Sequence, residues 1–324
     1  MPALILAVAE VVDGSPTRLS TEVATLARTL AEAAGGSALG LVLDAAPDAA
    51  AAALAAYLPR VVAVASDAVS GEVPAPHVAA EIARLLEEGV THVVIGATTD
   101  GRDIAGTLVG LTGLGLLANA DDAAWEDDGP VTCSVVLGGK AVTRSRLTAG
   151  AGLITLRPGG VTAVEAAARG SVEARVAAVP AVQAATVQER VAEAGAEVSL
   201  EDAQVVVVGG RGVGSPEGFA VVDELATLLG GVAGATRASV DAGWVPYSRQ
   251  IGQTGRVVKP ALYLGLGVSG AMQHRVGMQG SETIVAINRD QDAPIAEIAD
   301  LFVIGDLFEV GPLLAAEIRA RRGA

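Results

Sequence analysis

The stretch Val205–Pro216 reads VVVVGGRGVGSP and decides the fold of the C-terminal part of the chain. Four consecutive valines predict a strand that is covered on both faces, as in a parallel sheet. A glycine-rich turn follows, after which Ser215 and Pro216 are typical of a helix N-cap and first helical residue. The helix expected there ends at Gly230-Gly231. Strand, turn and helix in this order predict a doubly wound α/β domain.

The turn at 209–214 is a candidate anion site. Backbone N–H groups and the positive end of a helix dipole attract phosphate, and glycine lets the backbone approach it closely. Its G-x-G-x-G spacing is neither the dinucleotide fingerprint nor a P-loop. Arg211 inside the turn favours a ligand site, and a tight turn without ligand is the alternative.

Further strands are expected at 262–266, 284–287 and 302–304, with a final helix at 312–319. The polar or glycine-rich segments that follow strand ends are Thr236-Arg237, Gln250–Gly255, Gly265–His274, Asn288 and Asp306-Leu307. In an open parallel sheet such ends face one crevice, so these segments are expected to converge there. Taken singly, each could instead be a surface loop or charge, and His274 a satisfied core residue.

The N-terminal part shows a strand–helix alternation. Strands are expected at 3–8, 39–43, 61–65 and 92–96, and helices at 20–34 and 78–86. Beyond Gly101 the rhythm changes, into an acidic polar turn region (120–130), a hairpin (131–137 and 141–147) around Gly138-Gly139, and a strand at 153–156. Residues 160–200 are expected to connect the domains. The fold class is therefore α/β with two doubly wound domains, 1–200 and 201–324, the first carrying an added antiparallel patch and the second a Rossmann-like parallel sheet.

Composition excludes several classes of protein. The 324 residues carry a net charge of −15, which disfavours binding to nucleic acid or to an anionic membrane surface. The single cysteine, Cys133, rules out an intrachain disulfide and is expected to be an ordinary buried thiol. The absence of a targeting signal or an unbroken apolar span predicts a cytoplasmic prokaryotic protein.

No nucleophile elbow, Cys/His nucleophile or pair of catalytic carboxylates stands out, and the three histidines lack metal-site spacing. A bound cofactor that carries the chemistry fits this absence better than catalysis by side chains.

Six motifs, in order, make the second half resemble the FAD-binding domain of electron-transfer flavoprotein alpha subunits. They are GGRG (209–212), TRASVDAGWVP (236–246), QIGQTG (250–255), GVSGAMQH (267–274), TIVAINRD (283–290) and GDLFEV (305–310). GRD (101–103), GGKAV (138–142) and TLRPGG (155–160) extend the resemblance more loosely into the first half. Thr236 stands where many members have Ser, and Tyr247-Ser248-Arg249 is not a familiar part of the pattern.

The resemblance implies a role in FAD binding for each matching residue. Arg211 would approach the phosphates or the flavin edge. Thr236 and Arg237 match a Ser/Thr–Arg pair of the family, in which Arg237 would lie over the isoalloxazine, and His274 would donate to the flavin O2. Gln250, Ile251, Gly252, Gln253 and Thr254 would wrap the flavin, with Thr254 near N5. The pyrophosphate and ribityl region would be held by Ser269, Gly270, Ala271, Met272 and Gln273, and the adenosine half by Asn288, Asp306 and Leu307.

The resemblance also implies a soluble electron carrier and not an enzyme in its own right. Such subunits form a heterodimer with a smaller beta subunit that binds AMP and that the N-terminal domain would contact. The dimer takes electrons from acyl-CoA and related dehydrogenases, as in fatty acid beta-oxidation, and passes them to an electron-transfer flavoprotein quinone oxidoreductase at the membrane.

Three alternatives stay open beside this interpretation. An NAD-dependent oxidoreductase would need a G-x-G-x-x-G and an acidic residue about 20 positions on, and Asp223 follows Gly214 too closely. A nucleotide-sensing module would not need Arg237, Thr254 and His274 around one ring. A flavin-bifurcating relative would have a second FAD in the partner subunit.

Overall fold

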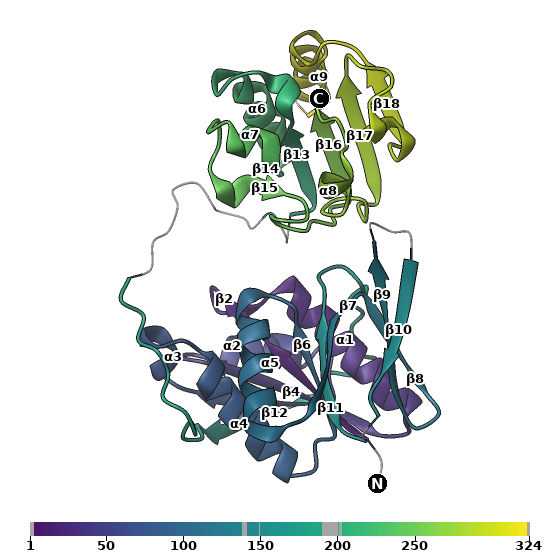
Figure 1. The fold of residues 1–324 in the computed structure, drawn as a ribbon. Coiled ribbons are helices and arrows are strands. Elements are labelled where there is room, and N and C mark those ends of the chain that lie inside the picture. The colour runs from purple at the N-terminus through teal and green to yellow at the C-terminus, as the bar shows by residue number, and fades with distance from the viewer. Residues whose placement is uncertain (1–2, 138–140, 149, 190–199, 201–202, 323–324) are drawn as a thin grey trace. The chain divides into compact units, whose positions relative to one another are not determined.

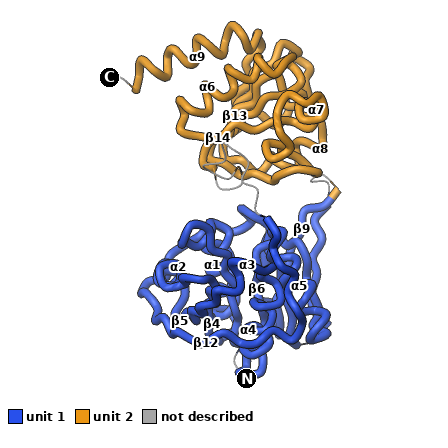
Figure 2. Tube along the Cα trace, turned by 90° about the vertical axis from the view of Figure 1, so that its left-hand side faces the viewer, with its two compact units in different colours: residues 1–136, 140–191 blue, residues 137–139, 192–324 orange. Residues whose placement is uncertain are grey.

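The computed structural model describes residues 3–137, 141–148, 150–189, 200 and 203–322. The chain divides into two compact units: unit 1, with residues 1–136 and 140–191, and unit 2, with residues 137–139 and 192–324 (Figure 2). The domain boundary expected between residues 200 and 201 adjoins ranges that lie outside the described residues. Each unit is built around its own parallel sheet (Figure 1).

Unit 1 has a seven-stranded sheet of order β12-β5-β4-β1-β6-β11-β7, in which all paired neighbours run parallel. Its strands are β1 (Leu4–Ala9), β4 (Ser37–Asp44), β5 (Arg60–Ala65), β6 (His92–Gly96), β7 (Gly115–Ala120), β11 (Gly152–Leu156) and β12 (Ser171–Val176). The central strands are apolar almost throughout because helices cover both of their faces. A short ribbon of β2 (Val11–Val12) and β3 (Ser15–Pro16) follows β1.

Helices pack on both faces of this sheet. They are α1 (Arg18–Ala33), α2 (Asp48–Leu54), α3 (Ala68–Gly71), α4 (Ala75–Glu87) and α5 (Thr99–Thr112). Leu30 of α1 and Leu54 of α2 belong to one buried cluster, whereas Ile82 of α4 and Leu108 of α5 belong to the cluster on the other face. The helix α5 continues the strand–helix rhythm past Gly101, where the sequence had suggested that it changes.

The antiparallel patch of unit 1 is a separate three-stranded sheet of order β10-β9-β8. It consists of β8 (Asp122–Glu126), β9 (Gly129–Val136) and β10 (Ala141–Arg146). The hairpin is thus confirmed, while its Gly138-Gly139 turn lies outside the described residues. Segment 120–130 is not simply a polar turn, because the whole of β8 lies in it. The acidic residues of this segment are compatible with strand pairing, because Arg144 pairs with Glu126 and Arg146 pairs with Asp128 across the sheet.

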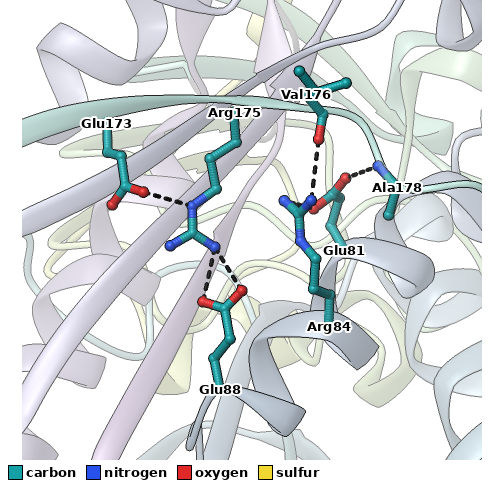
Figure 3. Close-up of polar contacts among 7 residues, drawn as sticks. All are labelled: Glu81, Arg84, Glu88, Glu173, Arg175, Val176 and Ala178. Atoms are coloured by element: carbon teal, nitrogen blue, oxygen red, sulfur yellow. Dashed lines mark hydrogen bonds and ion pairs between the residues drawn. The ribbon is translucent and has the colours of Figure 1, made fainter.

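The edge strand β12 lies in the segment that was expected only to connect the domains. Figure 3 shows the contacts of this strand and its continuation with α4 and with Glu88, which directly follows that helix. Arg175 donates two hydrogen bonds to the Glu88 carboxylate at 2.9 and 2.8 Å, and the Arg84 guanidinium donates to the Val176 carbonyl at 3.1 Å. The Glu81 carboxylate accepts the N–H of Ala178. These partners are about 90 residues apart in the chain, so local sequence pattern could not reveal the strand.

Unit 2 has a six-stranded sheet of order β15-β14-β13-β16-β17-β18, again with all pairs parallel. Its strands are β13 (Val205–Gly209), β14 (Val232–Thr236), β15 (Gln250–Ile251), β16 (Leu262–Leu266), β17 (Thr283–Asn288) and β18 (Leu301–Ile304). This is the strand order of the dinucleotide-binding Rossmann fold, so the predicted Rossmann-like sheet is confirmed.

The helices of unit 2 are α6 (Ala220–Leu229), α7 (Arg237–Asp241), α8 (Met272–Arg275) and α9 (Leu307–Arg322), with 3₁₀ turns η1 (Arg211–Val213), η2 (Glu217–Phe219), η3 (Tyr247–Arg249) and η4 (Pro294–Glu297). Ser215 caps the first turn as expected, by accepting the N–H of Gly218 at 3.2 Å. The final helix begins at Leu307 and not at Pro312, because Asp306 caps it through the N–H of Phe308 at 2.9 Å.

Candidate functional site

The centre of the unit 2 sheet is the point where the strand order reverses. From β13 the chain winds outward to β14 and β15, then returns to β16 on the other side of β13. We call the carboxyl ends of β13 and β16 the unit 2 switch point. Ligands of open α/β sheets bind in the crevice outside the strand ends at such a point.

Two glycine turns meet at the unit 2 switch point. Gly210 donates its N–H to the Leu266 carbonyl at 2.9 Å, and Gly212 donates to the Gly267 carbonyl at 3.1 Å. A Cβ on Gly210 would lie 2.3 Å from the Gly267 oxygen, and one on Gly212 would lie 2.8 Å from the Gly267 Cα. Only glycine permits this approach of the two backbones. The predicted convergence of the two turns is therefore seen in the structure.

Cationic side chains flank these turns. Arg211 is exposed, and its guanidinium has no ion-pair or hydrogen-bond partner within the described part of the chain. Arg237 begins α7 and pairs with Asp241 at 3.1 Å, both side chains being more than half exposed. Several N–H groups of the first turn are already bonded within the protein, so attraction for an anion comes chiefly from these guanidinium groups.

The start of α7 is attached to the first glycine turn through Ser239. This fully buried hydroxyl donates to the Gly209 carbonyl at 3.2 Å and lies 3.4 Å from the Thr236 hydroxyl. Thr236, which the sequence predicted as a ligand contact, is buried at the end of β14. The chain therefore positions Arg237 by a hydrogen-bonded turn whose key residue, Ser239, sequence reasoning missed.

The segment Gln250–Gly255 forms a loop that rests against the start of α8. The Gln250 side chain is buried and donates to the Thr254 hydroxyl at 3.1 Å, while the Gln253 N–H donates to the Gln273 carbonyl at 2.7 Å. Gly252 has φ +138°, a conformation that favours glycine. The side chains of Gln253, Thr254 and Gln273 are left exposed and can offer amide and hydroxyl groups to a ligand.

His274 is buried among protein partners. Its Nε2 lies 2.8 Å from the Tyr263 hydroxyl and its Nδ1 lies 3.0 Å from the Ile251 carbonyl oxygen. Burial lowers the pKa of His274 to about 4. A hydrogen bond from His274 to a ligand would have to replace one of these two contacts. Sequence reasoning missed Tyr263, although a tyrosine in an otherwise apolar buried strand signals a hydroxyl that needs a partner.

The residues of the second glycine turn differ in exposure. Ser269, Ala271 and Met272 are exposed, while Gly270 is buried with φ +76°, where a Cβ would lie 2.5 Å from the Ile295 nitrogen. Ser269 and Met272 can therefore reach a ligand, whereas Gly270 serves the close packing of the turn.

The predicted residues at the next strand ends have structural partners. Asn288 donates to the Val268 carbonyl at 2.9 Å and so holds the second turn. Asp306 caps α9 and pairs with Arg289, which lowers the pKa of its carboxyl. Leu307 is buried against Gly267. The structure thus brings Asn288 and Leu307 to the second turn.

The assembled residues fit an anionic ligand that also carries a polar heterocycle. The close-packed glycine turns and the exposed guanidinium of Arg211 suit phosphate groups, and the exposed Gln253, Thr254 and Gln273 suit ring N–H and carbonyl edges. A dinucleotide such as FAD has both parts. Within the described residues no helix is long and apolar enough to cross a lipid bilayer.

Comparison with known proteins identifies the family. The electron transfer flavoprotein domain matches residues 5–185, and the electron transfer flavoprotein FAD-binding domain matches residues 199–279. The electron transfer flavoprotein subunit alpha of Mycobacterium leprae is 42% identical over 82% of each chain. That of Bacillus subtilis is 40% identical over 72% of each chain. Protein FixB of Bradyrhizobium diazoefficiens is 39% identical over 71% of this chain and 64% of its own. The chain therefore belongs to the electron transfer flavoprotein alpha subunit family, and its C-terminal part contains the FAD-binding domain of that family.

Proposed function

We propose that the chain is the FAD-binding subunit of a heterodimeric electron carrier and does not itself transform a substrate. The observation that carries this proposal is the meeting of two glycine turns at the unit 2 switch point beside Arg211, which is exposed and has no ion-pair partner among the described residues. Bound FAD would supply the redox chemistry by accepting electrons from one protein and releasing them to another. The names of the Mycobacterium leprae and Bacillus subtilis relatives, each a subunit alpha, support assembly with a second, beta subunit.

The residues of unit 2 would share the work of binding. Arg211 would compensate phosphate charge, and Arg237 would place a fixed cation at the flavin, where it favours negatively charged reduced forms of the ring. Gln250, Ile251, Gly252, Gln253 and Thr254 would form the wall against the flavin. Ser269 to Gln273 would border the pyrophosphate and ribityl chain, with His274 behind them, and Asn288, Asp306 and Leu307 would border the adenosine half.

The finer assignments follow the same proposal. Residues 1–200 would contact a beta subunit that holds AMP, and residues 201–324 would hold FAD. Electrons would come from acyl-CoA and related dehydrogenases and would leave to an electron-transfer flavoprotein quinone oxidoreductase. Support for these partners comes from the family to which the chain belongs.

The absorption spectrum of the chain co-expressed with its partner subunit tests the proposal. A flavin spectrum with one FAD per heterodimer after release would support the carrier function. Two FAD per heterodimer would favour a flavin-bifurcating relative. A folded, colourless complex that takes up no added FAD would contradict the proposed function.

A further inference from the structure

Tyr263 is the largest fully buried side chain of unit 2, and it lies at the centre of the sheet in β16. A buried phenol hydroxyl needs a hydrogen-bond partner. Its oxygen lies 2.8 Å from His274 Nε2, and the two ring centroids are 6.1 Å apart in a tilted arrangement. Its most direct effect is therefore on the imidazole of His274, which lies in α8, the short helix next to the second glycine turn.

The partners of His274 determine where its proton lies. The Ile251 carbonyl can only accept a hydrogen bond, so the Nδ1 that lies 3.0 Å from it carries a hydrogen. Burial lowers the pKa of His274 to about 4, so the ring is neutral near pH 7 and Nε2 has a lone pair. The Tyr263 hydroxyl must then be the donor of the 2.8 Å hydrogen bond to Nε2.

This chain of hydrogen bonds connects three elements around the site. It runs from Tyr263 on β16 through His274 on α8 to Ile251 on β15. Two residues after Ile251, the N–H of Gln253 donates to the Gln273 carbonyl at 2.7 Å. The loop at 250–255 is therefore attached to α8 at two adjacent points, and one of them depends on the Nδ1-protonated tautomer of His274.

We propose that Tyr263 is a positioning residue of the cofactor site: by donating to Nε2 its hydroxyl stabilises the Nδ1-protonated tautomer of His274 that the Ile251 carbonyl requires, and His274 in turn holds the loop at 250–255 in its binding conformation. The second half of this inference rests on the proposed FAD site, and the first half does not. Tyr263 itself does not contact the ligand. In this arrangement the single N–H of His274 is bonded to the Ile251 carbonyl, so His274 offers an N–H to the crevice only if that hydrogen bond is given up.

Nitrogen NMR of the full chain without FAD, labelled with ¹⁵N-histidine, tests the first half. The chain has three histidines, and His274→Gln assigns the relevant signals. We expect a protonated Nδ1 and an unprotonated Nε2 in the wild-type protein, and a mixture of tautomers in Tyr263→Phe. Tyr57→Phe, the same deletion in unit 1, should leave the His274 signals unchanged. A protonated Nε2 in the wild type, or an unchanged pattern in Tyr263→Phe, would overturn the inference without requiring any variant to bind FAD.

Titration of the heterodimer with FAD tests the second half. Tyr263→Phe should weaken FAD binding by about five- to tenfold, the scale of one lost buried hydrogen bond, and should speed amide exchange at 250–255. Unchanged affinity in Tyr263→Phe, with normal binding by the wild type, would overturn this inference alone. Failure of the wild type to bind FAD would instead contradict the proposed function.

Discussion

The two units have related parallel sheets, but the strand ends at their switch points carry opposite charge. In unit 1 the strand order reverses between β1 and β6, and Glu10 follows β1. Its carboxylate accepts the Thr98 hydroxyl and would lie 3.1 Å from a Cβ on Gly101, in the first turn of α5. In unit 2 the corresponding place has Arg211, which is exposed and pairs with no acidic residue in the part of the chain that the structure describes. Unit 1 thus supplies its own anion to a helix N-terminus, whereas unit 2 is arranged to receive one.

This difference shows that the doubly wound fold alone does not make a nucleotide site. Function depends on the residues placed at the strand ends.

The comparison can be tested unit by unit, since the chain has two tryptophans, Trp125 in unit 1 and Trp244 in unit 2. Trp244→Phe and Trp125→Phe each leave one fluorescent reporter, so unfolding of the two units can be followed separately.

The largest effect is expected from Gly210→Val, which removes the contact between the glycine turns. Its Cβ would lie 2.3 Å from the Gly267 oxygen, so the backbones must separate. We expect FAD affinity to fall by about 10- to 100-fold, the equivalent of the 1–3 kcal/mol typical of overpacking. Isothermal titration calorimetry with FAD measures this loss of affinity. Gly280→Ala is the matched control in unit 2, because its Cβ would meet only the Lys259 side chain at 3.4 Å; equal losses in both variants would contradict the assignment.

The next effect is a loss of unit 2 stability in acid. The folded-state pKa of His274, about 4, lies below its ordinary value of 6.5, so the unfolded chain takes up this proton first as the pH falls. Stability is therefore complete above about pH 6.5 and is lost progressively down to about pH 4, by at most ~3 kcal/mol. Urea unfolding followed by Trp244 should show this slope, and His274→Gln should flatten it. A slope that His274→Gln leaves unaltered would assign the acid sensitivity to other groups.

A smaller effect is expected from Arg237→Ala. Removing this exposed cation should leave the fold intact but weaken binding of reduced, negatively charged flavin by about tenfold, which lowers a one-electron potential by roughly 59 mV. Spectroelectrochemistry of the FAD-loaded heterodimer measures the change. Arg237→Lys, which keeps the charge, should recover most of the lost potential.

His274→Ala should shift the potential less than Arg237→Ala does, and the opposite ranking would move the principal electrostatic role to His274.

The smallest effect is expected from Glu10→Gln in unit 1. Loss of the negative charge at the start of α5 should cost about 0.3–1 kcal/mol of unit 1 stability. FAD affinity should be unchanged. Urea unfolding followed by Trp125, together with an FAD titration, measures both quantities. An altered FAD affinity would show that the unit 1 switch point takes part in cofactor binding.

Much of the fold was predictable because buried parallel strands are continuous apolar runs, as at Val205–Val208 and His92–Gly96. The position of the site followed from topology, since it places the turns after β13 and β16 together. The elements that escaped prediction depend on distant partners. The strand β12 and its continuation contact Arg84 of α4 and Glu88, which directly follows that helix, and β8 contacts Arg144 of β10.

The hydrogen-bond partners of the site residues could not be predicted either. His274 was expected to face the ligand, yet Tyr263 and Ile251 occupy both of its ring nitrogens. Asp306 was expected at the adenosine, yet it also caps α9 and pairs with Arg289. Such pairings depend on side-chain directions that only the folded sheet fixes, so sequence pattern can place a residue at a strand end without showing what it contacts.

Hydrogen–deuterium exchange of the heterodimer with and without FAD tests the contrast between the two switch points most directly. The contrast predicts slower exchange on FAD binding in peptides that cover 209–214, 250–255 and 267–274. Peptides that cover Glu10 and residues 96–103 should exchange at the same rate in both states. Protection of those unit 1 peptides, or none at the glycine turns of unit 2, would contradict it.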